Sequence, residues 1–187
     1  MDLTESRISS ESVYDGALLH VRRDRVRLPD GGSSVREWID HPGAAAAVPV
    51  FADGTVLLVR QFRYPPGREF LEVPAGKLDR PGEDPLDLAR RELEEEAGLR
   101  AERWTPLGKT YPGIGYSNEV IHLYLAEGLT EVEPSLEDGE FVVPVRMPFA
   151  DAVELAKRGE VLDGKTAVAL LLADAERARR DENRASS

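Results

Sequence analysis

The segment Arg91-Glu92-Leu93-Glu94-Glu95-Glu96-Ala97-Gly98-Leu99 gathers carboxylates on one face of a predicted helix. Glu92 and Glu96 are four residues apart and Glu92 and Glu95 are three apart, so on a helix all three side chains point the same way. Like charges at this spacing repel each other, whereas a divalent cation removes the repulsion because hard ions prefer carboxylate oxygens. A solvated helix face is the alternative explanation of an acidic run. The flanking sequence favours a metal site.

The sequence on either side of this segment indicates where the helix begins and ends. Asp84 can cap the amino end, Pro85 suits the first helical position, and Gly98 is a typical residue at the carboxyl end. The glutamates then lie on a different face from the apolar positions. The residues expected to face the core are Leu86, Ala89, Leu93 and Ala97.

The remaining sequence predicts strands mixed with two further helices, which indicates an α/β sandwich. Residues 18–21 are expected to be extended. Apolar and charged residues alternate at 25–28 and 35–39, on the two sides of a Pro29-Asp30-Gly31-Gly32 turn, which is a hairpin signal. Further strands are expected at residues 45–50, 56–60, 70–73, 120–126 and 141–146. Helices are expected at residues 149–158 and from residue 165 onward. In the last helix the apolar positions are Val168, Leu171 and Leu172, and the polar end at 177–187 is expected to fray.

Gly76, Glu83 and the segment 91–99 together resemble the Nudix box, in which a glycine and a glutamate precede the pattern Arg-Glu-apolar-x-Glu-Glu-x-Gly-apolar. Seven residues separate Glu83 from Arg91, as is usual in the box. Six residues separate Gly76 from Glu83 where five are common, and the additional residue falls in a loop, where an insertion costs little. The resemblance implies the Nudix fold, an α/β/α sandwich with a mixed β-sheet.

The resemblance also implies hydrolysis of a phosphoanhydride with the help of Mg²⁺, with Mn²⁺ as an alternative. Such an ion neutralises phosphate oxygens and acidifies bound water. Gly76 would let the backbone approach metal and phosphate closely because it has no side chain. Glu83 and Arg91 are expected to support the site, Arg91 by pairing with a box glutamate rather than by touching phosphate. The residues implied as metal ligands are Glu92, Glu95, Glu96 and the backbone carbonyl of Ala75.

Two segments outside the box resemble ADP-ribose pyrophosphatases and related nucleoside-diphosphate-sugar hydrolases. They are Leu71-Glu72-Val73-Pro74-Ala75-Gly76, which leads into the box, and Tyr111-Pro112-Gly113-Ile114-Gly115-Tyr116-Ser117-Asn118-Glu119, which follows it. The substrate implied is a nucleoside diphosphate sugar, with ADP-ribose first and GDP-mannose or another sugar nucleotide as the alternative. A non-catalytic sensor that binds ADP-ribose is a further alternative, and the intact box glutamates argue against it.

The residues expected to contact this substrate are Arg63, Arg60, Glu72, Phe62 and Glu119. Paired arginines can bind a diphosphate bidentately, and Arg63 is the preferred phosphate contact. In an extended strand Arg63 lies on the face opposite to Arg60 and Phe62. Phe62 could stack on a base or ribose, or it could pack in the core. Glu119 could be a substrate contact, a metal contact or a solvated loop carboxylate.

The general base is expected in the acidic loop at residues 133–140. The resemblance places Glu140 at the catalytic position, with Glu137, Glu95 and Glu96 as alternatives. A solvated acidic loop is the other interpretation of this stretch.

The overall charge argues against several classes of protein. The chain has 24 lysine and arginine residues against 35 aspartate and glutamate residues, a net charge of −11, which argues against a sequence-independent nucleic-acid binder or a membrane-surface protein. It has no cysteine, and no apolar run approaches the length of a membrane span. The first residues lack the features of a signal peptide, so a cytoplasmic protein is expected.

The 187 residues are most simply one domain with a small extension. We assign residues 1–42 to an amino-terminal antiparallel β extension and residues 43–187 to the Nudix domain. The resemblance implies that such an extension exchanges between subunits, so a homodimer is expected.

Overall fold

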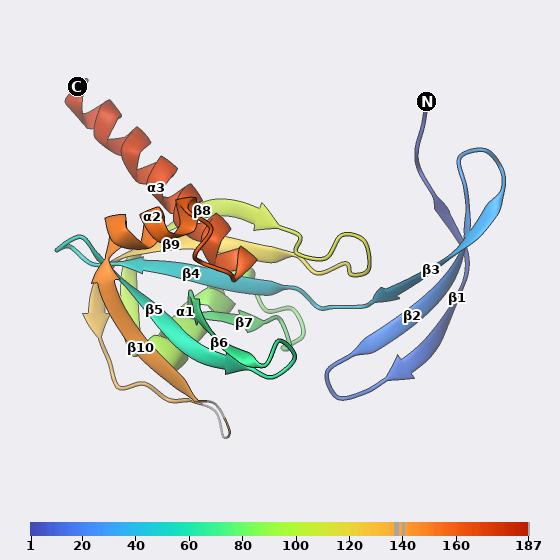
Figure 1. Ribbon diagram of the computed structural model, residues 1–187, viewed down its shortest axis with the longest axis horizontal. Coiled ribbons are helices and arrows are strands. Elements are labelled where there is room, and N and C mark those ends of the chain that lie inside the picture. Colours follow the sequence, from blue (N-terminus) through green and yellow to red (C-terminus); the bar gives the residue numbers. More distant parts are fainter. Residues whose placement is uncertain (137–138, 140, 187) are drawn as a thin grey trace. The chain divides into compact units, whose positions relative to one another are not determined.

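The computed structural model describes residues 1–136, 139 and 141–186 and divides them into two compact units (Figure 1). One unit contains Met1–Gly43 and Tyr111–Val120. The other contains Ala44–Thr110 and the described residues from Ile121 onward. Each unit has its own β-sheet.

The smaller unit is a three-stranded antiparallel sheet in the order β1-β2-β3. The predicted turn joins β2 to β3, and the antiparallel extension is confirmed. In this turn the Leu28 N–H donates to the Gly32 carbonyl (2.9 Å), and Gly31 has a φ of 87°, which glycine adopts readily. β1 is additional to the prediction, because its serines interrupt any apolar alternation. The strands are β1 (Ser6–Asp15), β2 (His20–Arg27) and β3 (Ser33–Ile39).

The larger unit is built on a seven-stranded mixed sheet whose main order is β10-β5-β4-β9-β8, with β6 beside β5 and β7 beside β4. β4 and β9 run parallel, whereas the other pairs are antiparallel. All five strands predicted in this part of the chain are found, as β4, β5, β6, β9 and β10. The strands are β4 (Ala44–Val50), β5 (Thr55–Arg63), β6 (Arg68–Glu72), β7 (Ala75–Lys77), β8 (Leu99–Thr110), β9 (Ile121–Glu131) and β10 (Val142–Pro148).

Strand β8 was not predicted, although it is the longest strand of this sheet. Pro106 and Gly108 fall within it, and both residues normally argue against a strand interior. The structure accommodates them with a shift of register between Pro106 and Gly108, where β8 pairs with β9. β8 is also the last strand in the order of the sheet, the position at which proline is tolerated.

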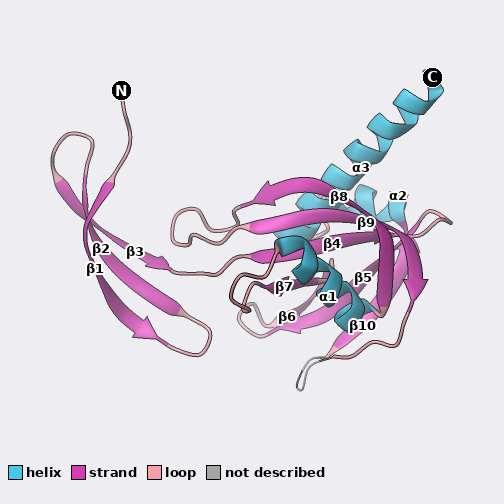
Figure 2. Cartoon of the chain, turned by 180° about the vertical axis from the view of Figure 1, so that it is seen from behind, coloured by secondary structure: helices cyan, strands magenta, loops and turns pink. Residues whose placement is uncertain are grey.

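Helices cover both faces of the large sheet, which confirms the α/β/α sandwich. Figure 1 shows α2 and α3 on the near face, and Figure 2, seen from behind, shows α1 on the other. Ala46 and Val48 of β4 belong to the core beneath α2 and α3, whereas Ala45 packs with Leu88 and Ala89 of α1. All of β4 is buried, because both faces of the strand are covered. The helices are α1 (Pro85–Ala97), α2 (Phe149–Lys157) and α3 (Gly164–Ala185).

Helix α3 stays regular along its polar end. It is helical to Ala185, so the fraying predicted from residue 177 onward is wrong. Arg180 explains this, because it donates to Glu176 one turn earlier (2.7 Å) and to Glu127 of β9 (2.8 Å).

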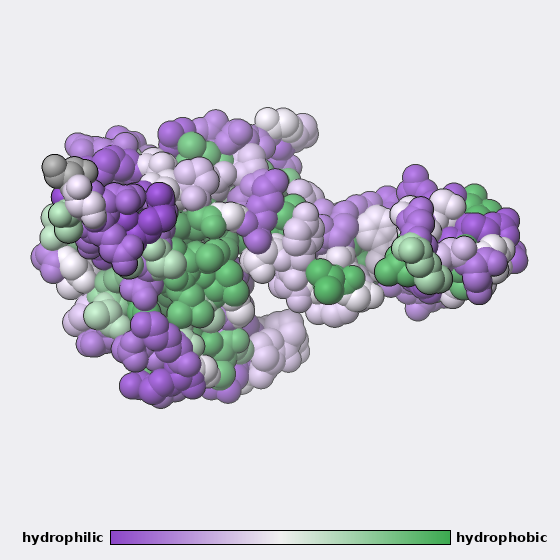
Figure 3. Space-filling view, turned by 90° about the horizontal axis from the view of Figure 1, so that it is seen from above, coloured by the Kyte–Doolittle hydropathy of each residue, from purple (hydrophilic) through white to green (hydrophobic). Residues whose placement is uncertain are grey.

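The large apolar side chains of α3 face partly outward. Val168, Leu171 and Leu172 are exposed, while Leu170 and its small neighbours are buried. Figure 3 shows apolar residues on the surface beside the polar end of this helix. None of the helices in the described part of the chain combines the length and apolar character needed to cross a membrane.

Candidate active site

Helix α1 presents the box glutamates and has both of the predicted ends. Asp84 caps it by accepting a hydrogen bond from the Leu86 N–H (2.8 Å). Gly98 ends it in the left-handed conformation, and the Gly98 N–H donates to the Glu94 carbonyl (3.1 Å). A Cβ atom at Gly98 would lie 2.8 Å from the Val132 carbonyl oxygen, so glycine is required there for space as well as for conformation.

The face of α1 that packs on the sheet differs from the prediction. The predicted Leu86 and Ala97 are only half-buried. The helix is turned so that the Glu96 residue is 7% exposed, although it carries a carboxylate. The buried residues of α1 are Leu88, Ala89, Leu93 and Glu96.

Two of the box glutamates lie against the backbone of β7. A Cβ atom at Gly76 would lie 2.0 Å from Glu92 Oε1, so any side chain there would displace that carboxylate. The Ala75 N–H donates to Glu96 Oε2 (3.0 Å). The structure therefore brings Glu92 and Glu96 together with the backbone of Ala75 and Gly76.

Arg91 lies among the acidic side chains of the box. Its Nη1 is 3.0 Å from both Glu92 Oε1 and Glu95 Oε2, and its Nε donates to Glu83 Oε1 (3.3 Å). Burial lowers the pKa of Arg91, but its contacts with these glutamates raise it by more, so the guanidinium stays charged. Arg91 thus joins α1 to the loop that contains Glu83 and balances carboxylates that would otherwise repel each other.

The donor set suits a hard divalent cation. Glu92, Glu95 and Glu96 offer carboxylate oxygens, and the missing side chain at Gly76 lets backbone lie beside them. Across the described residues, no three His, Cys, Asp or Glu side chains form a closed group of metal ligands. Arg91 and the Ala75 N–H contact the box carboxylates here. The residues therefore fit such an ion in donor type, whereas their arrangement here is that of carboxylates paired with Arg91 and the Ala75 N–H.

Arg63 and Glu72 bind each other between β5 and β6. Arg63 Nε donates to Glu72 Oε1 (2.7 Å) and Arg63 Nη2 donates to Glu72 Oε2 (2.8 Å), which is a bidentate pair. The Lys165 ammonium of α3 also contacts Glu72. Burial raises the pKa of Glu72, but Arg63 and Lys165 lower it by more, so the carboxylate is ionised with only 3% of its side chain exposed. Lys165 is not among the predicted residues, because it meets Glu72 across 93 positions of sequence and no local pattern marks that contact.

Arg60 and Phe62 alternate with Arg63 along β5 and so lie on its opposite face. Arg60 pairs with Glu69 at the surface (2.8 Å). Phe62 is 56% exposed, so the interpretation that it packs in the core is wrong. The structure does not bring Arg60 and Arg63 onto one face as a pair of phosphate contacts.

The structure does not place the remaining predicted residues relative to the box glutamates. Glu119 belongs to the smaller unit, where its Oε1 is 3.9 Å from His41 Nε2 and its N–H donates to Ser117 Oγ (3.0 Å). Glu137 and Glu140, the candidates for the general base, lie outside the described residues.

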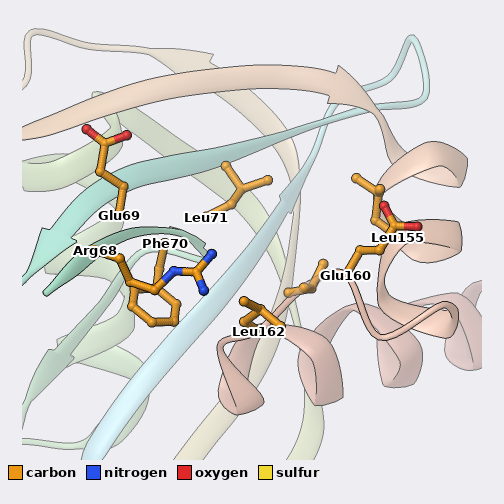
Figure 4. Close-up of a pocket in the computed structure, with 8 residues that line it drawn as sticks. Arg68, Glu69, Phe70, Leu71, Leu155, Glu160 and Leu162 are labelled. Atoms are coloured by element: carbon orange, nitrogen blue, oxygen red, sulfur yellow. The ribbon is translucent and has the colours of Figure 1, made fainter. Parts of the chain in front are cut away.

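The larger unit also has a small pocket that none of the box glutamates lines (Figure 4). The Arg68 guanidinium in this lining is 5.5 Å from the centre of the Phe70 ring. The volume of this pocket is about 100 Å³, whereas small-molecule sites usually enclose roughly 300–1,000 Å³. The pocket is therefore too small for a nucleotide sugar. The residues that line it are Arg68, Glu69, Phe70, Leu71, Leu155, Glu160, Val161 and Leu162.

Replacing Glu72 with glutamine tests the buried pair. The pKa of Glu72 is lowered in the folded state, so its contribution to stability is present above its ordinary value of 4.5 and is lost as the pH falls through the lower folded value. We expect Glu72→Gln to reduce the free energy of unfolding by about 3 kcal/mol at pH 7, because Arg63 loses its charged partner and Lys165 keeps only Asp163. The difference from wild type should shrink below pH 4.5. Urea unfolding at several pH values measures both effects.

Glu69→Gln is the matched control, since Glu69 pairs with Arg60 at the surface of the same two strands. It should change the free energy of unfolding by less than about 1 kcal/mol. Equal losses in the two variants would contradict the importance of burial at Glu72.

Known proteins similar to this chain identify its family. Residues 40–169 match the NUDIX domain, and residues 5–39 match the nucleoside diphosphate sugar hydrolase N-terminal domain. The chain is 39% identical over 170 residues to an ADP-ribose pyrophosphatase of Bacillus subtilis, covering 90% of this chain and 91% of that protein. It is 41% identical over 159 residues to an ADP-ribose pyrophosphatase of Mycobacterium tuberculosis, covering 83% and 76%. It is 33% identical over 157 residues to a GDP-mannose pyrophosphatase of Yersinia enterocolitica, covering 76% and 81%.

A solved structure has the same fold. It is the crystal structure of an ADP compounds hydrolase, with a TM-score of 0.83 and 23% sequence identity over 96% of this chain and 98% of that one. The match of residues 40–169 covers well over half of the 187 residues, and two relatives exceed 38% identity over most of the chain. The chain therefore belongs to the Nudix family and is a Nudix hydrolase that carries an amino-terminal domain of the nucleoside diphosphate sugar hydrolase type.

Proposed function

We propose that this Nudix hydrolase cleaves the diphosphate bond of a nucleoside diphosphate sugar, with ADP-ribose as the first candidate and AMP and ribose 5-phosphate as the products. The observation that carries the proposal is the placement of Glu92 and Glu96 against the backbone of Ala75 and Gly76. The similarity to two ADP-ribose pyrophosphatases and the match to the amino-terminal domain support the substrate class. GDP-mannose is the alternative, supported by the 33% identity to a GDP-mannose pyrophosphatase.

We assign a role in the reaction to the residues of the box and to those near it. The ligands of Mg²⁺ or Mn²⁺ would be Glu92, Glu95, Glu96 and the Ala75 carbonyl, and the ion when bound supplies positive charge to the diphosphate oxygens and acidifies water. Arg63 uses Nε and Nη2 for Glu72, so its Nη1 edge is turned away from that carboxylate and is available to a phosphate oxygen. Arg91 and Glu83 hold the helix and the loop in place. Among the other predicted contacts, the exposed Phe62 ring is available to stack on a base.

Hydrolysis adds water across the anhydride. The oxygen of water bonds to one phosphorus, the bond from that phosphorus to the bridging oxygen breaks, and the bridging oxygen leaves with the other phosphate. The proton of water passes to a carboxylate, which we assign to Glu140 on the resemblance to ADP-ribose pyrophosphatases. Glu137, Glu95 and Glu96 are the alternatives.

A panel of nucleotides tests the proposed reaction. The purified protein is mixed with ADP-ribose, GDP-mannose, UDP-glucose, a diadenosine polyphosphate and a nucleoside triphosphate, each with Mg²⁺, with Mn²⁺ and with a chelator. We expect metal-dependent release of AMP and ribose 5-phosphate from ADP-ribose to be the fastest cleavage. Loss of a metal ligand in Glu92→Gln should reduce kcat/KM by more than about 100-fold.

Glu94→Gln is the control for this experiment, because Glu94 lies on the same helix but pairs with Arg100. It should leave the rate within about twofold of wild type. Faster cleavage of GDP-mannose would favour the alternative substrate, and binding of ADP-ribose without turnover would favour a sensor.

Glu140→Gln tests the assignment of the general base. We expect kcat to fall by roughly 10²–10⁴-fold, the usual effect of removing a positioned base, with unchanged thermal unfolding. Glu133→Gln in the same acidic stretch is the control and should retain wild-type kcat. Unchanged turnover in Glu140→Gln would move the role to Glu95, Glu96 or Glu137.

We also propose that residues 1–42 are a dimerisation extension of a Nudix domain at residues 43–187. β1 is the first strand in the order of its sheet and every residue of it is exposed, including Ile8 and Val13, and such an edge strand can pair with a strand of another molecule. Light scattering during gel filtration should give twice the chain mass of 20.6 kDa. Ile8→Lys combined with Val13→Lys should give a monomer, while Ser9→Lys should not. A monomer mass for the wild type would contradict the proposal.

A further inference from the structure

The first turn of α3 is tied to the end of β6 through buried polar groups. Asp163 caps the helix by accepting hydrogen bonds from the Thr166 N–H (3.0 Å) and the Thr166 hydroxyl (2.5 Å). The same hydroxyl oxygen accepts the Val73 N–H (2.9 Å), and Thr166 is fully buried. This turn of α3 therefore has one fixed position against the residue that follows β6.

Lys165 of that turn is connected to Arg63 through a series of ion pairs. Its ammonium contacts Glu72 and is 2.9 Å from Asp163 Oδ2. Glu72 in turn holds Arg63 through both carboxylate oxygens. The side chains of Lys165 and Glu72 are 13% and 3% exposed, whereas that of Arg63 is 46% exposed. Of these three groups, only the last reaches solvent to a large extent.

The charges of this cluster balance. Arg63 and Lys165 are cations and Glu72 and Asp163 are anions, so the four groups sum to zero. Without the charge of Lys165, the buried carboxylate of Glu72 and the half-buried carboxylate of Asp163 would lie beside one guanidinium, and the sum would be −1. An anion that approaches Arg63 would then meet a net negative cluster.

Arg63 is also electrostatically coupled to the box. Its hydrogen bonds with Glu72 raise the pKa of Arg63, burial lowers it, and the charges of Glu96 and Asp163 raise it further. Glu96 is one of the box glutamates that lie against Ala75. Arg63 is therefore close enough to Glu96 for their charges to act on each other.

We propose that Lys165 is a positioning residue for Arg63: it holds Glu72 and offsets its charge, so that the free edge of the Arg63 guanidinium is presented to the diphosphate as a cation. This inference rests on the proposed function, in which Arg63 binds that diphosphate. Lys165 itself acts through Glu72 and need not touch the substrate.

Steady-state kinetics of Lys165→Met, with the hydrolysed nucleotide sugar, test the inference. Removing a charge that favours substrate and transition state alike raises KM and leaves kcat unchanged, so we expect KM to rise about 10-fold with kcat within about threefold. Lys165→Arg keeps the charge and should restore KM to within about threefold of wild type. Lys157→Met is the matched control, because Lys157 pairs with Glu154 and Asp174 at the surface, and it should behave as wild type.

A double-mutant cycle separates positioning from a general structural effect. If Lys165 acts through Arg63, then Lys165→Met should change KM by less than about twofold in an Arg63→Met background, because the group it positions is gone. Additive effects of the two substitutions would overturn the inference. So would an unchanged KM in Lys165→Met. Lys165→Gln replaces the methionine variant should the latter lose the folded spectrum in circular dichroism.

A measurement without turnover keeps this inference separate from the proposed reaction. The Nε–H resonance of Arg63 in a ¹⁵N spectrum, assigned by its loss in Arg63→Met, reports the hydrogen bond to Glu72 directly. We expect this resonance to shift or exchange faster in Lys165→Met and to stay in place in Lys157→Met. If no nucleotide sugar is cleaved, the proposed reaction fails while a moved resonance still supports the link from Lys165 to Arg63. An unmoved resonance overturns that link.

Discussion

Glu92 and Glu96 of α1 lie against the backbone of β7 at Gly76 and Ala75, and little of either residue is exposed. A carboxylate taken out of water loses several kcal/mol of hydration unless other groups compensate. The Ala75 N–H and the Arg91 guanidinium provide that compensation, and the bare Cα of Gly76 leaves the room. The orientation of α1 on the sheet and the path of the loop with Glu83 both depend on these contacts.

The backbone from Val73 to Ala75, where β6 leads into β7, contacts helices on both faces of the sheet. On one side the Val73 N–H donates to Thr166 of α3, and on the other the Ala75 N–H donates to Glu96 of α1. The two helices lie on opposite faces of the sheet (Figures 1 and 2). A displacement of either helix would therefore move the backbone of the proposed metal site. This explains why residues outside the box, such as those that begin α3, belong to the same physical unit.

Local chemistry allowed much of this to be predicted from the sequence. The ends of α1 follow from Asp84 and Gly98, because caps depend on residue type at one position. The sandwich follows from the alternation of strands and helices. The rotation of α1 was not predictable, since the buried Glu96 accepts a hydrogen bond from the Ala75 N–H, which lies 21 positions away in the sequence. Lys165 was missed for a similar reason, because its partner Glu72 comes from a distant strand.

For the residues predicted to contact substrate, the sequence indicates which strand face they share but not which side chains they pair with. Periodicity places Arg63 opposite to Arg60 on β5, and the strand has that alternation. It does not show that Glu72 engages Arg63, because cross-strand register depends on how β5 and β6 pair. Phe62 shows the limit of a single strand pattern, since an alternating apolar residue is buried only where another layer covers it.

The irregular stretch of β8 has a consequence for the protein at high concentration. β8 is the last strand of the larger sheet, and a straight strand in that position offers unpaired N–H and carbonyl groups to the strands of other molecules. Pro106 has no N–H to offer, and the register shift between Pro106 and Gly108 bends the strand. Edge-to-edge growth of the sheet into aggregates is therefore discouraged on this side.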